Sequence, residues 1–131
     1  IAELADSGVD FAFESTLASL SLGKIIETVR ARNYTIDIAF IWIDNAEMAV
    51  DRVRRRVEAG GHFIPEAVVR RRYRRSCDNF YLRYRHLAND WYFFDNSASP
   101  TIMVAECKCD GRIEVFDNTA WESFIANTER E

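Results

Sequence analysis

The spacing of hydrophobic positions along this chain changes repeatedly between that of a strand and that of a helix. Residues 9–15 form a short apolar run that ends in polar residues, which predicts a buried strand. In residues 22–33 the apolar side chains recur every three or four positions, which predicts a helix that Asn33 closes. Residues 35–44 are mostly β-branched or aromatic, as expected of a central parallel strand.

The rest of the chain continues this alternation. A helical pattern over residues 46–61 stops at paired glycines, and a longer helix is predicted over residues 65–88, with proline in its first turn. The pair Asp110–Gly111 is typical of a hairpin turn, and Thr119 with Glu122 predicts a capping box for a final helix. The remaining elements are predicted at residues 90–97, 101–109, 112–117 and 119–127.

Alternating helices and strands predict an α/β fold with a mainly parallel sheet. The length of 131 residues suits a single domain over residues 1–131. The chain begins at Ile1, inside a helical pattern and without Met, which we interpret as a fragment whose N-terminal part is absent. No apolar run approaches the roughly 20 residues of a membrane span, and three cysteines are too few for a disulfide framework. We therefore expect a cytoplasmic protein without a membrane partner.

Arginine is concentrated in one part of an otherwise acidic chain. The net charge is −4, but residues 52–85 hold eleven arginines against three acidic residues, so the rest of the chain carries a balance of −12. This contrast predicts a local site for anions rather than a generally basic protein. Cys107 and Cys109 lack the CxxC spacing or histidine partner of a zinc site, so no metal ligands are predicted.

Helical geometry separates the arginines that can face a site from those that point into solvent. At about 100° per residue, Arg52 and Arg56 lie on one side of their helix, near the edge of its apolar face. Arg72 flanks the apolar stripe of the next helix. Such side chains are held by packing at their base, while the guanidinium group reaches sideways and can fork onto phosphate oxygens. We therefore expect these three arginines to converge on one anionic pocket.

Two other interpretations of the arginines stay open at this point. They could form a solvated helix face with internal ion pairs such as Glu66–Arg70 and Arg74–Asp78. They could also belong to a nucleic-acid-binding module in which tyrosines stack on bases. The tyrosines concerned are Tyr73, Tyr81 and Tyr84, and most of them fall on the apolar stripe, which argues against nucleic acid as the partner.

Two further groups of polar residues are candidates for a site. Gly60 and Gly61 lie between the two arginine-bearing helices and are typical of a hinge before a flap; the next residue, His62, could contact phosphate or cap the preceding helix. Glu14 and Thr16 follow the first predicted strand, and ligands of parallel sheets bind at the carboxyl ends of strands. They could orient a substrate hydroxyl or cap the next helix.

Four segments of the chain together match a known family: FAFESTL, FIWID, RVRRRVEAGGHFIPEAVVRRRYRR and FFDNS. From about Val9 to Ser97 the sequence resembles the zeta-toxin-like family of small P-loop ATPases and kinases. The resemblance implies a three-layer P-loop kinase-like fold with a helical lid over about residues 60–76. It also implies an ATP-dependent transferase that moves the γ-phosphoryl group to a small-molecule hydroxyl, which in the better-known toxins belongs to UDP-N-acetylglucosamine. The branch that this sequence most resembles is described only as predicted ATPases or kinases.

The resemblance also implies roles for individual arginines. Arg52 matches an arginine that stacks near adenine, and Arg56 matches one that contacts phosphates, which makes both candidates for nucleotide binding together with His62. Arg72 matches a lid arginine that closes on the transferring phosphoryl group. Arg56 and Arg72 are therefore the candidates for catalysis.

On the acceptor side, Glu14 and Thr16 match the E-G-T substrate-binding motif of the toxins. Ser15 stands where that motif has glycine, and Ala18 stands where the toxins carry a substrate-binding arginine. These departures weaken the match to a sugar-nucleotide substrate, so the expected partners are ATP and a small-molecule acceptor that the sequence does not identify.

The G-x-x-x-x-G-K-[ST] motif of a phosphate loop does not occur in the sequence. The resemblance implies that this loop, the Mg²⁺ ligands and the catalytic aspartate lie upstream of Ile1. We therefore expect ATP and Mg²⁺ to serve the parent protein, and this chain alone to be inactive. Toxin relatives are held inactive by a protein partner, so an antitoxin is a further expected partner.

Overall fold

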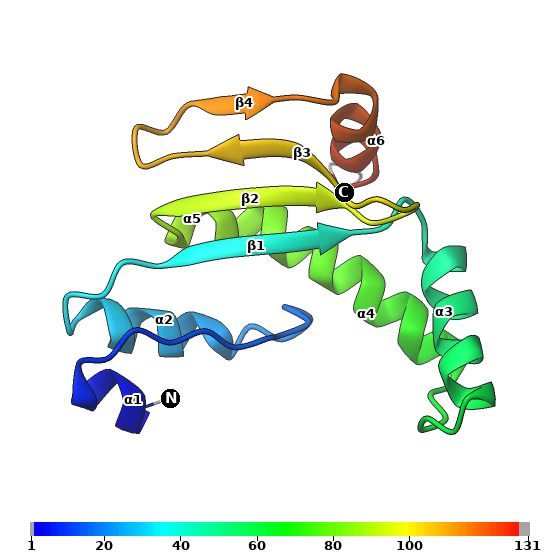
Figure 1. Ribbon diagram of the computed structural model, residues 1–131, viewed down its shortest axis with the longest axis horizontal. Helices are drawn as coiled ribbons and strands as arrows, with labels where there is room; N and C mark the ends of the chain where they lie inside the picture. Colours follow the sequence, from blue (N-terminus) through cyan, green and yellow to red (C-terminus); the bar gives the residue numbers. More distant parts are fainter. Residues whose placement is uncertain (1, 129–131) are drawn as a thin grey trace.

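The computed structural model describes residues 2–128 (Figure 1). The helices are α1 (Ala2–Ser7), α2 (Leu22–Arg30), α3 (Ala46–Glu58), α4 (Glu66–Asn79), the π-helix η1 (Phe80–Tyr84), α5 (Arg85–Leu87) and α6 (Asn118–Thr128). The strands are β1 (Asp37–Trp42), β2 (Asp90–Asp95), β3 (Ile102–Cys107) and β4 (Ile113–Val115). Helices and strands alternate, so the predicted α/β class is confirmed. None of the described helices is both long and apolar enough to cross a bilayer.

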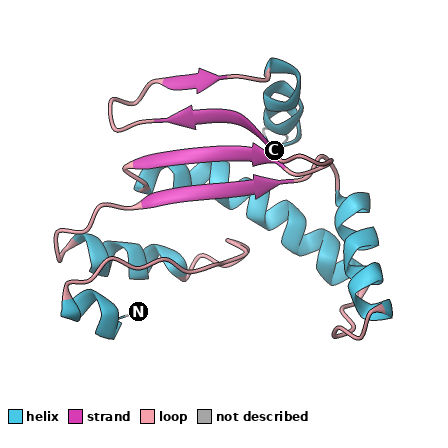
Figure 2. Ribbon diagram, in the orientation of Figure 1, coloured by secondary structure: helices cyan, strands magenta, loops and turns pink. Residues whose placement is uncertain are grey.

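The four strands form one mixed sheet in the order β1-β2-β3-β4 (Figure 2). β1 and β2 are parallel, in a register that pairs Phe40 with Phe93, whereas the two other pairings are antiparallel. The sheet of residues 2–128 is therefore mixed rather than mainly parallel, and β3 and β4 form the hairpin predicted around Asp110–Gly111. β1 also lies at an edge of the described sheet, which corrects the prediction of a central strand at residues 35–44.

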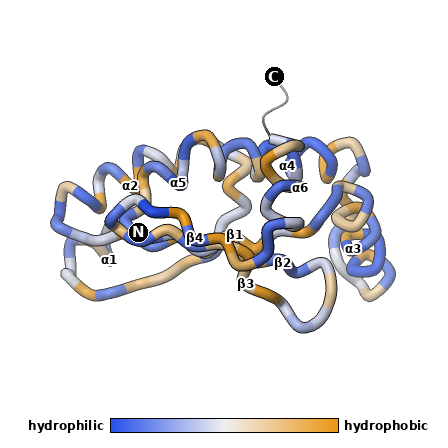
Figure 3. The backbone as a smooth tube through the Cα atoms, turned by 90° about the horizontal axis from the view of Figure 1, so that it is seen from above, coloured by the Kyte–Doolittle hydropathy of each residue, from blue (hydrophilic) through white to orange (hydrophobic). Residues whose placement is uncertain are grey.

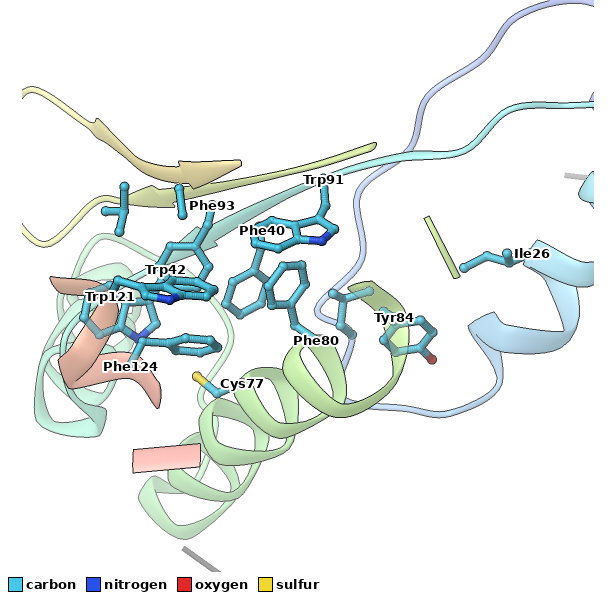
Figure 4. Close-up of a cluster of buried hydrophobic side chains, with 13 residues drawn as sticks. Ile26, Phe40, Trp42, Cys77, Phe80, Tyr84, Trp91, Phe93, Trp121 and Phe124 are labelled. Carbon is cyan, nitrogen blue, oxygen red and sulfur yellow. The ribbon is translucent and has the colours of Figure 1, made fainter. Parts of the chain in front are cut away.

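One face of the sheet buries an aromatic core, which Figure 4 shows between the strands and the long helix. Phe80 and Phe93 are 0% exposed, and the ring of Phe80 stacks on that of Phe40 with centroids 4.5 Å apart. Such ring pairs stabilise the core beyond the area that they bury. On the opposite face Ile41 is 54% exposed. The predicted fold has a sheet with a helical layer on each face. The described residues form the sheet and one of the two helical layers.

The long helix formed by α4, η1 and α5 packs with the apolar stripe that its sequence predicts. Its buried residues are Val69, Cys77, Phe80 and Tyr84, and its half-buried ones include Tyr73 and Leu87. In Figure 3 the orange, hydrophobic stretches concentrate along the strands at the centre of the molecule. The helix therefore owes its position to burial of this stripe against the sheet.

Two local predictions are wrong. Residues 9–15 form no strand, and they do not pair with the edge of β1 or with any other strand of residues 2–128. The cap of α6 is Asp117, whose Oδ1 accepts a hydrogen bond from the Ala120 amide at 3.1 Å. The predicted capping box of Thr119 and Glu122 is therefore replaced by a cap two residues earlier.

Candidate functional site

An open cleft of about 880 Å³ lies along the unpaired edge of β1. Every residue from position 36 to position 43 lines it, so the cleft runs the length of the strand and meets both of its faces. Residues 11–17 form the facing wall, and α2 supplies an apolar floor through Leu22, Ile25, Ile26 and Val29. In Figure 1 this wall is the blue segment that runs alongside α2, below β1.

Four of the six predicted site residues border this cleft. Glu14 and Thr16 come from the wall segment, Arg56 comes from α3, and Arg72 comes from α4. The two arginines belong to successive helices, joined by the turn of residues 59–65. The cleft is thus bordered by two arginines and by the two candidate acceptor-side residues.

The two other predicted residues lie elsewhere. Arg52 is half-buried, and its Nη2 donates hydrogen bonds to the carbonyls of Asn96 at 2.5 Å and Ser97 at 3.5 Å. It therefore fastens α3 to the loop after β2. His62 is exposed in the turn between the helices and does not border the cleft. Arg56 and Arg72 thus both border the cleft, whereas Arg52 does not, and the convergence of all three arginines stays a prediction.

Arg70 ties the two arginine-bearing helices together. Its Nη1 lies 2.5 Å from Glu47 Oε1 of α3, and its Nη2 lies 2.7 Å from Glu66 Oε1 of α4. The hydrogen bond to Arg70 lowers the pKa of Glu47, and the bonds to both glutamates raise the pKa of Arg70. The predicted pair Arg74–Asp78 also forms, with Arg74 Nε 3.8 Å from Asp78 Oδ2. Part of the arginine cluster is therefore a solvated face with internal ion pairs.

Arg56 and Arg72 are also exposed, and both border the cleft. Within the described part of the chain, neither takes part in an ion pair. Their charge is therefore not neutralised by a carboxylate of residues 2–128. A pair of unneutralised guanidinium groups in one cleft suits a ligand with several negative charges, such as a polyphosphate.

The loop at residues 15–19 is fastened to the long helix by three side chains that sequence reasoning missed. Ser76, Asn79 and Tyr84, which we call the anchor residues, each donate a hydrogen bond to a carbonyl of this loop. The pairs are the Ser76 hydroxyl with Thr16, the Asn79 amide with Leu17 at 2.7 Å, and the Tyr84 hydroxyl with Ser19 at 2.5 Å. A signal was present in the sequence, because these polar groups lie on or beside the apolar stripe of a helix.

Burial also changes the chemistry of two groups on the same helix. It raises the pKa of the Cys77 thiol to about 12, so this thiol stays neutral at physiological pH. It also raises the pKa of Tyr73, whose hydroxyl donates a hydrogen bond to the Ile43 carbonyl at 2.6 Å. With Tyr84 only 1% exposed and Tyr73 half-buried, these tyrosines do not present an open stacking surface for nucleic-acid bases.

Comparison with known proteins adds three findings. The sequence pattern of one family, described as zeta toxin, matches residues 1–106. The chain is 34% identical over 65 residues to an uncharacterized protein of Haemophilus influenzae, a match that covers 50% of this chain and 46% of that protein. The match thus spans about half the length of this curated relative. No solved structure matches the chain.

Proposed function

Because this chain belongs to the zeta toxin family, which has a P-loop kinase-like fold, we propose that it is part of an ATP-dependent phosphotransferase. The reaction would transfer the γ-phosphoryl group of ATP to the hydroxyl of a small molecule. One observation carries this proposal: the cleft beside β1 is bordered by Arg56 and Arg72 and also by Glu14 and Thr16. The residues that we propose for phosphate binding and for acceptor binding thus border the same cleft.

The two arginines supply the charge that phosphoryl transfer needs. Negative charge spreads over the oxygens of the transferring group, and catalysis depends mostly on positioning and on neutralising this charge. Guanidinium groups remain protonated at any physiological pH and can donate two parallel hydrogen bonds to phosphate. Arg56 and Arg72 have no carboxylate partner among the described residues, so their charge is available for this role.

On the opposite wall, Glu14 and Thr16 suit the binding of a hydroxyl acceptor. The carboxylate of Glu14 can accept a hydrogen bond from the attacking hydroxyl and so orient its oxygen toward the phosphorus atom. The Thr16 hydroxyl oxygen already accepts a hydrogen bond from the Ala18 amide at 3.3 Å, so its own proton remains available for a substrate oxygen. Both residues therefore act as positioning groups at the acceptor side.

Among residues 2–128, no group of three or more His, Cys, Asp or Glu could hold a metal ion. We therefore assign no step to a metal. The sequence also lacks a phosphate-loop motif, and we propose that residues outside this sequence provide it. The unpaired edge of β1 is a fitting place for its strand, since an apolar parallel strand is normally paired on both edges.

The proposal is tested by replacing Arg72 in the full-length protein and measuring ADP formation from ATP. We expect Arg72→Ala to lower the rate about 10²- to 10³-fold, as for other lost donors to a transition state. Arg71→Ala is the matched control, because Arg71 is exposed on the same helix and does not border the cleft. Full activity of Arg72→Ala would contradict the proposed role of the cleft.

A further inference from the structure

The anchor residues connect two parts of the proposed site. Ser76 follows Arg72 by one turn, a rise of about 6 Å along the helix, and both residues border the cleft. The hydroxyl of Ser76 donates to the carbonyl of Thr16, which lies on the opposite wall. The helix that carries the lid arginine therefore also holds the acceptor-side loop directly.

The backbone of this loop has a conformation that needs such support. Leu17 has a φ of 57°, in the left-handed region that residues other than glycine rarely adopt. Its side chain is only 7% exposed and belongs to the buried core, its amide donates to Ser15 Oγ at 3.2 Å, and its carbonyl accepts from Asn79. A strained residue persists only where its surroundings over-determine it, and such residues cluster at functional sites.

The π-helix η1 explains how Tyr84 reaches the same loop as Ser76. Eight residues separate them, and in an uninterrupted α-helix their directions would differ by about 80°. The wider π turn advances less per residue and rotates Tyr84 back toward the side of Ser76. Figure 4 shows Tyr84 beyond Phe80 on the long helix, at the end away from Cys77. Because of this irregular turn, Ser76, Asn79 and Tyr84 can all donate hydrogen bonds to the same loop.

We propose that Ser76, Asn79 and Tyr84 are positioning residues that couple the acceptor-side loop to the lid helix. The carbonyls of Thr16, Leu17 and Ser19 are bonded to the same continuous helix that carries Arg72, so the loop keeps a defined position relative to this arginine. Ordering of the helix by a nucleotide bound at Arg72 would therefore also order the acceptor-side loop. The identity of the nucleotide in this inference rests on the proposed function. The anchoring of the loop does not, because the hydrogen bonds are present in the structure.

The test is hydrogen–deuterium exchange on the full-length protein, with and without Mg²⁺ and the non-hydrolysable analogue β,γ-imido ATP. Tyr84→Phe removes one donor and keeps the buried ring, and Asn79→Ala removes the donor to Leu17. Asn127→Ala is the matched control, since the Asn127 amide donates to the Ser123 carbonyl within α6 and not, among residues 2–128, to the loop. In the wild type we expect the analogue to slow exchange in residues 59–72 and also in residues 14–19.

In the two anchor variants, exchange of residues 14–19 should be about three- to tenfold faster without nucleotide, the effect of one lost hydrogen bond. The analogue should still slow residues 59–72 and no longer slow residues 14–19. The inference is overturned if residues 14–19 behave in these variants as they do in Asn127→Ala. If the analogue has no effect on the wild type, the ATP proposal fails, and the nucleotide-free rates still decide whether these side chains hold the loop.

Discussion

Residues 90–95 and residues 9–15 have similar apolar sequences but reach different structures. The first segment forms β2, with β1 on one side and β3 on the other, so its backbone groups are paired along both edges. The second segment lies across an open cleft from β1 and forms no strand. A strand-forming sequence is therefore not sufficient, because the backbone also needs a neighbour that satisfies its hydrogen bonds.

The two regions also differ in how their side chains are held. Around β2 the aromatic rings pack on every side, and Phe93 has five ring neighbours. In the wall of the cleft, Phe13 is 49% exposed. Side chains bonded to backbone carbonyls stabilise the second region, whereas hydrophobic burial stabilises the first.

The largest expected effect is a difference in unfolding free energy between a substitution in the aromatic core and one in the cleft wall. Phe80→Ala should lower the free energy of unfolding by about 3–5 kcal/mol, because it empties a fully buried position in the aromatic core. Phe13→Ala should change it by less than about 1 kcal/mol, because much of this ring is already in contact with water. Urea denaturation followed by tryptophan fluorescence measures both. Equal losses would show that the cleft wall is packed as tightly as the core.

A smaller effect concerns Cys77, which borders the cleft from the packed side. Burial raises the pKa of the Cys77 thiol from an ordinary value of 9.0 to about 12. Above pH 9 the thiol therefore ionises in the unfolded state but keeps its proton in the folded state. This thiol should therefore leave the free energy of unfolding unchanged below pH 9 and lower it by about 2 kcal/mol by pH 10.5.

The measurement for Cys77 is the slope of the unfolding free energy against pH between 9 and 10.5. Cys77→Ala should flatten that slope, whatever its effect on stability at neutral pH. Cys109→Ala should leave the slope unchanged, since this cysteine is exposed. A slope that is the same in all three proteins would mean that water reaches the Cys77 thiol in the folded state.

The smallest effect tests the cap of α6, at the end of the packed region. Asp117→Ala should cost about 1 kcal/mol, the usual loss for an N-cap, because the Ala120 amide loses its acceptor. Thr119→Ala should cost no more than about 0.5 kcal/mol, since Thr119 is exposed and does not cap the helix. Thermal unfolding of both variants compares them, and a greater loss for Thr119→Ala would restore the capping box that the sequence predicts.

Features that depend on neighbours in the chain could be predicted from the sequence. The stripe that buries Cys77 and Phe80 follows from helical periodicity, and the pair Glu66–Arg70 follows from a spacing of four residues. The turn at Asp110–Gly111 follows from its residue types. The same reasoning selected Arg56 and Arg72, both of which border the cleft.

Features that depend on distant residues could not be predicted in this way. Arg52 has the helical position expected of a ligand-binding arginine, but its guanidinium group bonds to a carbonyl 44 residues away, at Asn96. The edge position of β1 depends on which strands lie beside it, and hydrophobicity alone does not contain this information. The left-handed conformation of Leu17 arises from contacts with the long helix, and its residue type gives no indication of it.

One edge of β1 has no partner strand among residues 2–128, which also affects how this chain behaves in solution. Soluble proteins usually protect such an edge with lysine, proline or a bulge, which prevent another chain from adding a strand. In the sequence DIAFIW of β1, Asp37 is the only charged residue, and proline is absent. The edge is therefore a template for intermolecular sheet formation, and crowding of many copies favours aggregation unless a further strand covers it.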